Sequence, residues 1–254
     1  MIARCFSLAL LVCFSMPVLA LSEAELEAIG RRVWKNECGG TVEGLTSWNE
    51  GEGFASLGIG HFIWYPKGAN GPYEESFPPL LKFLAEHGRK LPGWLSPSAD
   101  CPWNSRAEFR ADAGSARMKE LRALLADTVP LQSQFLAHRM ESALPKLLEA
   151  APAGKREQVK EQFERLAATG KGTFALIDYV NFKGEGTNPA ERYRGEGWGM
   201  LQVLEGMDPD AKSPAKEFGE SAARVLAKRV ENAKPKNEAQ WLKGWTNRVK
   251  AYGE

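Results

Sequence analysis

The sequence has few of the features that mark metal proteins, nucleic-acid binders and membrane proteins. Its three histidines show no paired spacing, so we expect neither a metal site nor a cofactor. Lysine and arginine together number 33 against 32 acidic residues, a net charge of +1 that gives no reason to expect a nucleic acid. Beyond the N-terminus the chain has no repeat, no heptad run and no low-complexity stretch, and we expect no membrane span.

Residues 1–20 have the composition of a secretory signal. Arg4 supplies the positive start, Phe6 to Phe14 form an apolar core too short for a bilayer, and the segment ends in the small-residue site Val18-Leu19-Ala20. Cleavage near Ala20 predicts a periplasmic or secreted chain of residues 21–254. Without Arg4 the basic and acidic residues of that chain are equal in number.

Export leaves two cysteines, Cys38 and Cys101, because Cys5 and Cys13 belong to the predicted signal. Two thiols in an oxidising compartment more often pair than stay free, so the sequence predicts a disulfide between Cys38 and Cys101. Closing so long a loop typically stabilises a protein by about 2–4 kcal/mol. The disulfide either stabilises the fold as a whole or specifically fixes the helix end at Glu37.

Helical periodicity dominates the sequence and predicts a mainly α chain of the α+β class, folded as one domain over residues 21–254. Ser22 and Glu25 form a capping box that starts the first helix. Between about residues 64 and 110 the chain is rich in proline, glycine and tryptophan, and we expect an ordered insertion because its aromatic residues are too apolar for a free linker. Further helices are predicted over residues 79–87, 115–126, 130–148, 155–168, 174–182, 198–205, 214–232 and 239–252.

The most informative stretch runs from Glu50 to His61 and reads E-G-E-G-F-A-S-L-G-I-G-H. Its glycines predict a short β-hairpin whose returning strand contains Phe54, Leu57 and Ile59. Glu37 lies upstream, near the end of the first predicted helix and on its apolar face. A helix end and a hairpin can therefore present opposing carboxylates, which is the arrangement that glycoside hydrolysis needs.

The run G-F-A-S-L-G-I-G-H resembles the hairpin of phage-type lysozymes, in which a helix-end glutamate is followed by an aspartate, a threonine and G-x-G-H. Counting back from His61 places Ser56 at the threonine position and Glu50 at the aspartate position, and Glu37 is the candidate for the helix-end glutamate. The chain departs from that pattern in two ways, since a glutamate replaces the aspartate and the connection from Glu37 to Glu50 is a few residues longer. Residues 175–186, A-L-I-D-Y-V-N-F-K-G-E-G, are similar to the family's buried central helix and its glycine-rich exit.

The resemblance implies a lysozyme-like fold and a muramidase or endolysin activity on the glycan strands of peptidoglycan. Glu37 is then the general acid, kept protonated by apolar neighbours, while Glu50 and Ser56 orient the attacking water or stabilise the sugar cation. Glu52 is an alternative to Glu50 on the same turn. For His61 the resemblance implies a mainly structural role.

Tryptophan is frequent, with eight residues, and sugar rings stack well on aromatic faces. Trp48, Trp64 and Trp198 are candidate substrate contacts, although most tryptophans in such a domain only pack. Asn181, a polar residue late in an apolar helix, either lines the cleft or caps the helix end.

Two other functions remain open. Glu185, in the segment K-G-E-G-T-N-P, resembles the catalytic glutamate of lytic transglycosylases, which also have a lysozyme-like fold and cleave with one carboxylate; otherwise Glu185 is a polar loop residue. The replaced aspartate and the longer connection also suit a lysozyme-like module without turnover, which binds glycan or a proteinaceous lysozyme inhibitor. In each case we expect a monomer whose partner is peptidoglycan or a related polysaccharide.

Overall fold

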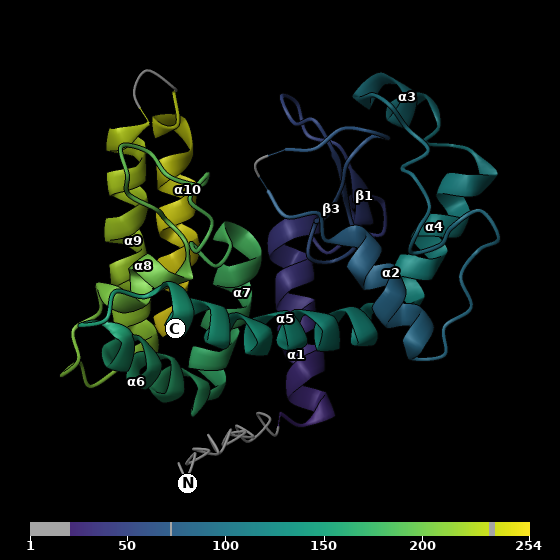
Figure 1. The fold of residues 1–254 in the computed structure, drawn as a ribbon. Helices are drawn as coiled ribbons and strands as arrows, with labels where there is room; N and C mark the ends of the chain where they lie inside the picture. Colours follow the sequence, from purple (N-terminus) through teal and green to yellow (C-terminus); the bar gives the residue numbers. More distant parts are fainter. Residues whose placement is uncertain (1–20, 72, 234–236) are drawn as a thin grey trace, which may run out of the picture.

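The computed structural model describes residues 21–71, 73–233 and 237–254, so the predicted signal in residues 1–20 lies outside the described residues. The described chain is mainly helical and carries a small antiparallel sheet of three strands, which confirms the predicted mainly α class (Figure 1). One continuous cluster of buried apolar side chains runs through helices and sheet alike. None of the described helices is long and apolar enough to cross a membrane.

The predicted helices are present, with ends displaced by a few residues. The helix expected from residue 174 begins earlier because the Thr169 hydroxyl accepts a hydrogen bond from the Gly172 amide and so caps an additional turn. A short helix that periodicity did not predict begins after Ser105. The helices are α1 Glu23–Cys38, α2 Phe77–Glu86, α3 Arg106–Ala111, α4 Ala116–Asp127, α5 Val129–Ala150, α6 Arg156–Ala167, α7 Gly170–Lys183, α8 Met200–Glu205, α9 Pro214–Asn232 and α10 Ala239–Lys250, with 3-10 turns at Glu43–Leu45 and Ala251–Gly253.

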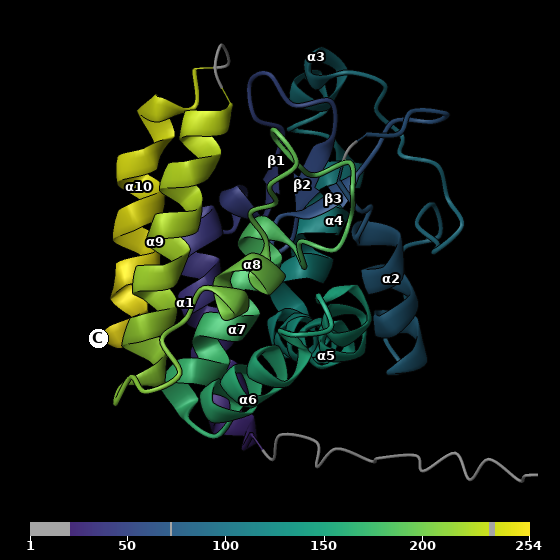
Figure 2. The ribbon, with the colours of Figure 1, turned by 60° about the vertical axis from the view of Figure 1, so that its left-hand side comes forward.

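Helix α7 forms the centre of the helical part and is buried on every side from Gly172 to Val180. Figure 2 shows it between α5 on one side and α9 with α10 on the other. Helix α5 crosses the molecule and joins this part to the sheet with α2, α3 and α4 (Figure 1). Helix α1 packs against both α5 and α7, so its C-terminal end lies where the two parts of the molecule meet.

The strands β1 Thr46–Ser47, β2 Ala55–Leu57 and β3 Phe62–Trp64 pair in that order. The predicted hairpin is therefore displaced: Ile59 lies in the turn between β2 and β3, and Glu50 lies in the loop between β1 and β2. The physical reason is a side chain from α5. Gln132 accepts a hydrogen bond from the Ile59 amide at 2.9 Å, and a Cβ atom at Gly58, where φ is +71°, would lie only 2.4 Å from the same oxygen.

The described residues between 64 and 110 contribute to the common core. The Trp64 ring centroid lies 4.9 Å from that of Phe77 and 6.3 Å from that of Trp103. Helix α2, which begins at Phe77, packs against β3 and against α5. The insertion thus covers the sheet and braces its outermost strand.

The predicted disulfide is wrong. Cys38 and Cys101 are both buried and both free. The Cys38 thiol donates to the Gly58 carbonyl at 3.3 Å beneath the β2–β3 turn, whereas the Cys101 backbone forms a bridge with Pro66 in the insertion. Each thiol fills its own apolar site, as a free cysteine commonly does.

We expect both thiols to be unreactive in the folded chain. Burial raises the pKa of Cys38 and of Cys101 to about 12, so hardly any thiolate is present at pH 8. A thiol reagent such as Ellman's reagent should therefore react slowly with the native chain of residues 21–254 and rapidly, at two sites, after unfolding in guanidinium chloride. An unfolded chain without titratable thiols would show that the two cysteines are paired after all.

Candidate functional site

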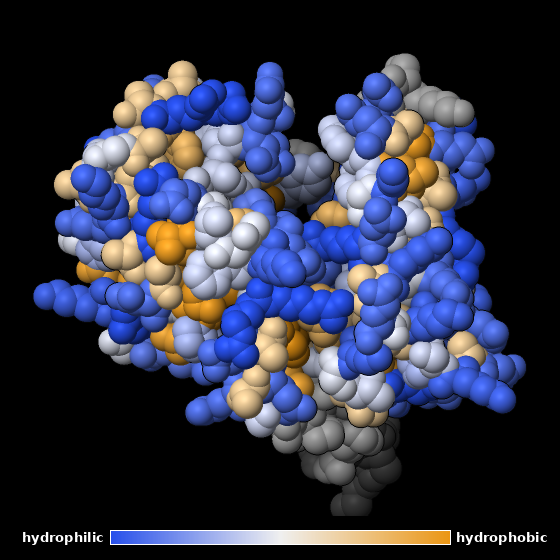
Figure 3. Space-filling model, turned by 180° about the vertical axis from the view of Figure 1, so that it is seen from behind, coloured by the Kyte–Doolittle hydropathy of each residue, from blue (hydrophilic) through white to orange (hydrophobic). Residues whose placement is uncertain are grey.

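A hollow opens between the two parts of the molecule, with the sheet on one side and α9 and α10 on the other (Figure 3). Helix α1 ends beneath this hollow (Figure 1). The helix stops because Gly39 adopts φ +63°, the left-handed conformation that closes many helices. The last turn of α1 therefore places Glu37 at the junction between the helices and the sheet.

Glu37 is held between two basic side chains. One carboxylate oxygen accepts a hydrogen bond from Arg248 Nη2, and the other lies 3.5 Å from His61 Nδ1. The carboxylate is only 14 % exposed. The sequence predicted apolar neighbours for Glu37, and the structure shows a charged environment instead.

Arg248, from α10, is fixed in place by a buried carboxylate. Asp178, in the middle of α7, is fully buried and accepts two hydrogen bonds of 2.8 Å from the guanidinium of Arg248 and one of 2.6 Å from the Tyr252 hydroxyl. Burial lowers the pKa of Arg248, but Asp178 and Glu37 raise it by more, so the guanidinium remains charged. Glu37 is thus positioned by a cation that cannot move without leaving Asp178 unpaired.

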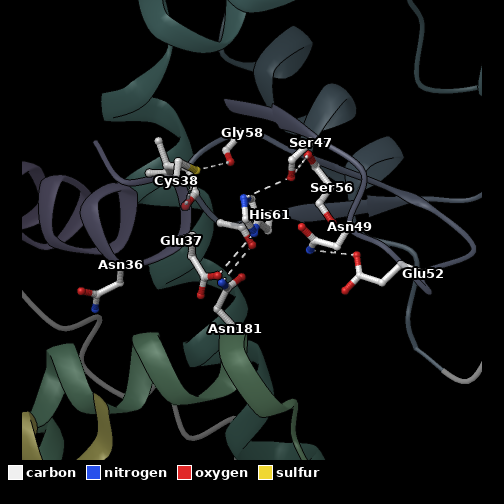
Figure 4. Close-up of polar contacts among 12 residues, drawn as sticks. Asn36, Glu37, Cys38, Ser47, Asn49, Glu52, Ser56, Gly58, His61 and Asn181 are labelled. Atoms are coloured by element: carbon white, nitrogen blue, oxygen red, sulfur yellow. Dashed lines mark hydrogen bonds and ion pairs between the residues drawn. The ribbon is translucent and has the colours of Figure 1, made fainter. Parts of the chain in front are cut away.

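His61 connects Glu37 to the sheet. Its Nε2 atom lies 3.4 Å from the Ser47 hydroxyl, which donates to the Ser56 carbonyl at 3.4 Å (Figure 4). The backbone of His61 has φ +48°, which is uncommon for a residue other than glycine and follows from the tight β2–β3 turn. A line of polar groups therefore runs from the end of α1 across the strands β1 and β2.

The loop between β1 and β2 turns Glu52, rather than Glu50, toward this line. Glu50 is exposed and makes no side-chain hydrogen bond or ion pair within the described residues. Glu52 is partly buried and accepts a hydrogen bond from Asn49 at 3.0 Å, while the Trp48 indole donates to its backbone carbonyl at 2.7 Å. Burial raises the pKa of Glu52, although hydrogen bonds from Asn49 and Ser56 and the charge of His61 oppose that rise.

Asn181 lies near Glu37 and Ser56 lies near Glu52, but both residues are largely occupied by the fold. Ser56, in β2, is buried in the sheet at 3 % exposure. Asn181, in α7, donates to the Gly60 carbonyl at 2.9 Å and accepts from Arg139 at 3.4 Å. Figure 4 places its side chain next to Glu37. Asn181 therefore ties α7 to the β2–β3 turn, a role that the sequence did not indicate.

The three candidate tryptophans are buried. Trp48, Trp64 and Trp198 are 7 %, 2 % and 5 % exposed, so none of them offers an open ring face to a sugar. The three tryptophans are packed in the protein interior, which was the alternative to a substrate contact in the sequence analysis. Trp241, which sequence reasoning did not single out, is 51 % exposed at the start of α10.

Glu185, the alternative catalytic residue, follows the end of α7 and belongs to a different set of contacts. Its carboxylate forms an ion pair of 2.8 Å with Lys146 and accepts a hydrogen bond from the Thr187 hydroxyl at 3.4 Å. In the described part of the chain it makes no hydrogen bond or ion pair with Glu37, His61 or Glu52. No observation favours Glu185 over Glu37.

Neither a metal site nor a similarity to a known protein adds a function to this site. Among the residues that the structure describes, no group of three or more histidine, cysteine, aspartate and glutamate side chains could hold a metal ion. Comparison of the chain with protein-family models, with curated proteins and with solved structures finds no match.

Proposed function

We propose that the chain is an exported, lysozyme-like glycoside hydrolase that cleaves the glycan strands of peptidoglycan. The observation that carries the proposal is the convergence of Glu37, His61, Ser47 and Glu52 from a helix end and a small sheet beneath an open hollow. The resemblance of two segments to phage-type lysozymes supports the same activity, and the mainly helical fold with a small sheet agrees with it. The site meets the first requirement of glycosidic cleavage, which is two carboxyl groups in different settings.

Glu37 acts as the general acid in this proposal. Glu37 first takes up a proton from water against its ion pair with Arg248, and then gives it to the glycosidic oxygen as the bond to the sugar breaks. The negative charge left on Glu37 is stabilised by Arg248. Because Asp178 holds Arg248 in position, this stabilising charge is preorganised and needs no rearrangement during the reaction.

Glu52 supplies the second carboxylate. It orients or deprotonates the attacking water, and the hydroxyl of Ser47, held by His61, is a further hydrogen-bonding group on the same side. Glu50 takes no part, because it faces solvent.

Replacing Glu52 with glutamine is expected to lower kcat by about 10²–10⁴-fold, the usual range for loss of a general base. The amide keeps the shape of the side chain and can still hydrogen-bond to Asn49. Release of new reducing ends from purified peptidoglycan measures kcat, and circular dichroism checks the fold. Glu50→Gln, two residues away on the same loop, is the matched control and should keep near wild-type activity.

The wild-type pH profile tests the same assignment. Because burial raises the pKa of Glu52 above the ordinary 4.5 of a glutamate, its ionised form is lost as the pH falls through that higher value. We therefore expect kcat/KM to fall to half of its maximum on the acid side at a pH above 4.5. Equal losses in Glu50→Gln and Glu52→Gln would remove the distinction between the two carboxylates.

A further inference from the structure

A cavity of about 310 Å³ lies between α1, α7 and α10. Its apolar wall consists of the aromatic rings of Phe174, Phe182 and Trp245, and it reaches the surface beside Gly244, which is exposed. This volume is at the lower end of the range for small-molecule sites, which are mostly apolar and carry a few polar groups that fix the ligand. The cavity therefore suits a small, flat molecule with an apolar body.

Arg32, from α1, is a cation in the wall of this cavity. Its guanidinium carbon lies 3.9 Å from the centroid of the Phe174 ring, and its Nη2 atom donates to the Ala251 carbonyl at 2.9 Å. Within residues 21–71, 73–233 and 237–254 its side chain makes no other hydrogen bond and no ion pair. The ring and the carbonyl fix the plane of the guanidinium, so its remaining N–H groups are already oriented for an acceptor.

Arg248, from α10, is a second cation in the same wall. Its Nε and Nη2 atoms donate to Asp178 and Glu37, whereas its Nη1 atom makes no hydrogen bond in the described part of the chain. No acidic side chain is among the described residues that line the cavity. Two guanidinium groups in an apolar cavity favour a ligand with a carboxylate, whose two oxygens match their planar donors.

Gly244 gives a second, independent indication that the cavity takes a ligand. The residue lies in the middle of α10, where glycine destabilises a helix relative to alanine. A Cβ atom there would have no heavy atom within 4 Å, and the backbone is not left-handed, so neither close packing nor conformation requires glycine. The effect of the glycine is to leave the wall of the cavity without a side chain.

The cavity is distinct from the site around Glu37. Asn36, the preceding residue on α1, lines the cavity, and Figure 4 shows its side chain turned away from His61. Within the described residues, neither Glu37 nor any strand contributes to the lining. Arg248 belongs to both places, because it lines the cavity and also binds Glu37.

We propose that this cavity binds a small aromatic carboxylate. The ring of the ligand packs among Phe174, Phe182 and Trp245, and its carboxylate accepts hydrogen bonds from Arg32 and from Nη1 of Arg248. Such binding does not require a glycan in the hollow, so it is independent of the proposed function.

The test titrates the isotope-labelled chain of residues 21–254 with 2-naphthoate and with its uncharged analogue 2-naphthamide. We expect 2-naphthoate to bind with a Kd of about 1 mM or tighter, the usual affinity for a ligand of this size. The amide should bind about tenfold or more weakly, because it lacks the charge that strengthens hydrogen bonds from arginine. In the NMR spectrum the Trp245 indole and the Gly244 amide should shift, whereas the Trp103 indole, in the insertion, should not.

Two variants test the same assignment, with thermal unfolding as the check on the fold. Arg32→Met should weaken the binding of 2-naphthoate about tenfold or more, whereas Arg31→Met removes an equal charge from a 59 % exposed position and should leave the Kd unchanged. Gly244→Leu, whose side chain fills the cavity, should abolish binding. Equal Kd values of the wild-type chain for the acid and the amide, shifts that spare Trp245, or an Arg32→Met chain that binds 2-naphthoate like the wild type would each overturn the proposal.

Discussion

Glu37→Gln is expected to lower the release of reducing ends from peptidoglycan by about 10³-fold or more, in the upper part of the range for loss of a general acid. A glutamine oxygen can still accept the hydrogen bond from Arg248, so the fold and the position of the side chain should be kept. The amide cannot give a proton to the leaving oxygen. The measurement is the initial rate on purified peptidoglycan, with thermal unfolding as the check on the fold.

The matched control for this variant is Glu27→Gln, on the same helix. Glu27 is 54 % exposed and, among the residues that the structure describes, pairs only with Arg31, one turn away, so its loss should leave the rate unchanged. A folded Glu37→Gln chain with full activity would reject Glu37 as the acid, whatever the other variants do.

Arg248→Met is expected to lower the free energy of unfolding by about 3–5 kcal/mol, because it leaves the fully buried Asp178 carboxylate without its main partner. The Tyr252 hydroxyl and the Asn36 amide, which donates to Asp178 at 3.5 Å, cannot replace a guanidinium that donates twice. The midpoint of denaturation in urea should fall while the slope stays the same.

Arg31→Met provides the comparison for that loss. Arg31 is 59 % exposed and pairs with Glu27 on the surface of α1, and such pairs contribute about 0.3–0.5 kcal/mol. Similar stabilities for the two arginine variants would mean that the Asp178–Arg248 pair contributes no more than a surface pair.

The sequence predicts the elements well where a periodic pattern alone decides them. Helices α9 and α10 begin where the pattern places them, at Pro214 and Ala239, because both have an amphipathic stripe and α9 also starts with a proline. Where a distant side chain intervenes, the pattern fails. The β2–β3 turn is shaped by Gln132, which lies 73 residues from Ile59 in the chain, and no local signal in the hairpin reveals it.

The candidate site is predictable in part for the same reason. Glu37 and His61 were found because they lie in or beside a recognisable motif, and the structure brings them together. Arg248 lies 211 residues from Glu37, and its role depends on the packing of α10 against the rest of the helical part. The choice between Glu50 and Glu52 depends on a loop that is anchored by the Trp48 indole, which spacing within the sequence does not show.

The disulfide prediction failed because it used only the expected oxidising compartment and the number of cysteines outside the predicted signal. Pairing also requires that two side chains point at one another across a short distance. Cys38 is turned toward the Gly58 carbonyl, and Cys101 lies in the insertion beside Pro66, so neither faces the other. Only the packed structure contains that information.

The products that the chain releases from purified peptidoglycan test the proposed function most directly. Mass spectrometry of the soluble fragments distinguishes the three functions that the sequence left open. Hydrolysis by Glu37 and Glu52 predicts fragments that end in an ordinary reducing sugar with one added water at each cut. Fragments that end in an internal anhydro sugar would point to transglycosylation, and bound but uncut strands would mean a binding protein; either result contradicts the hydrolase.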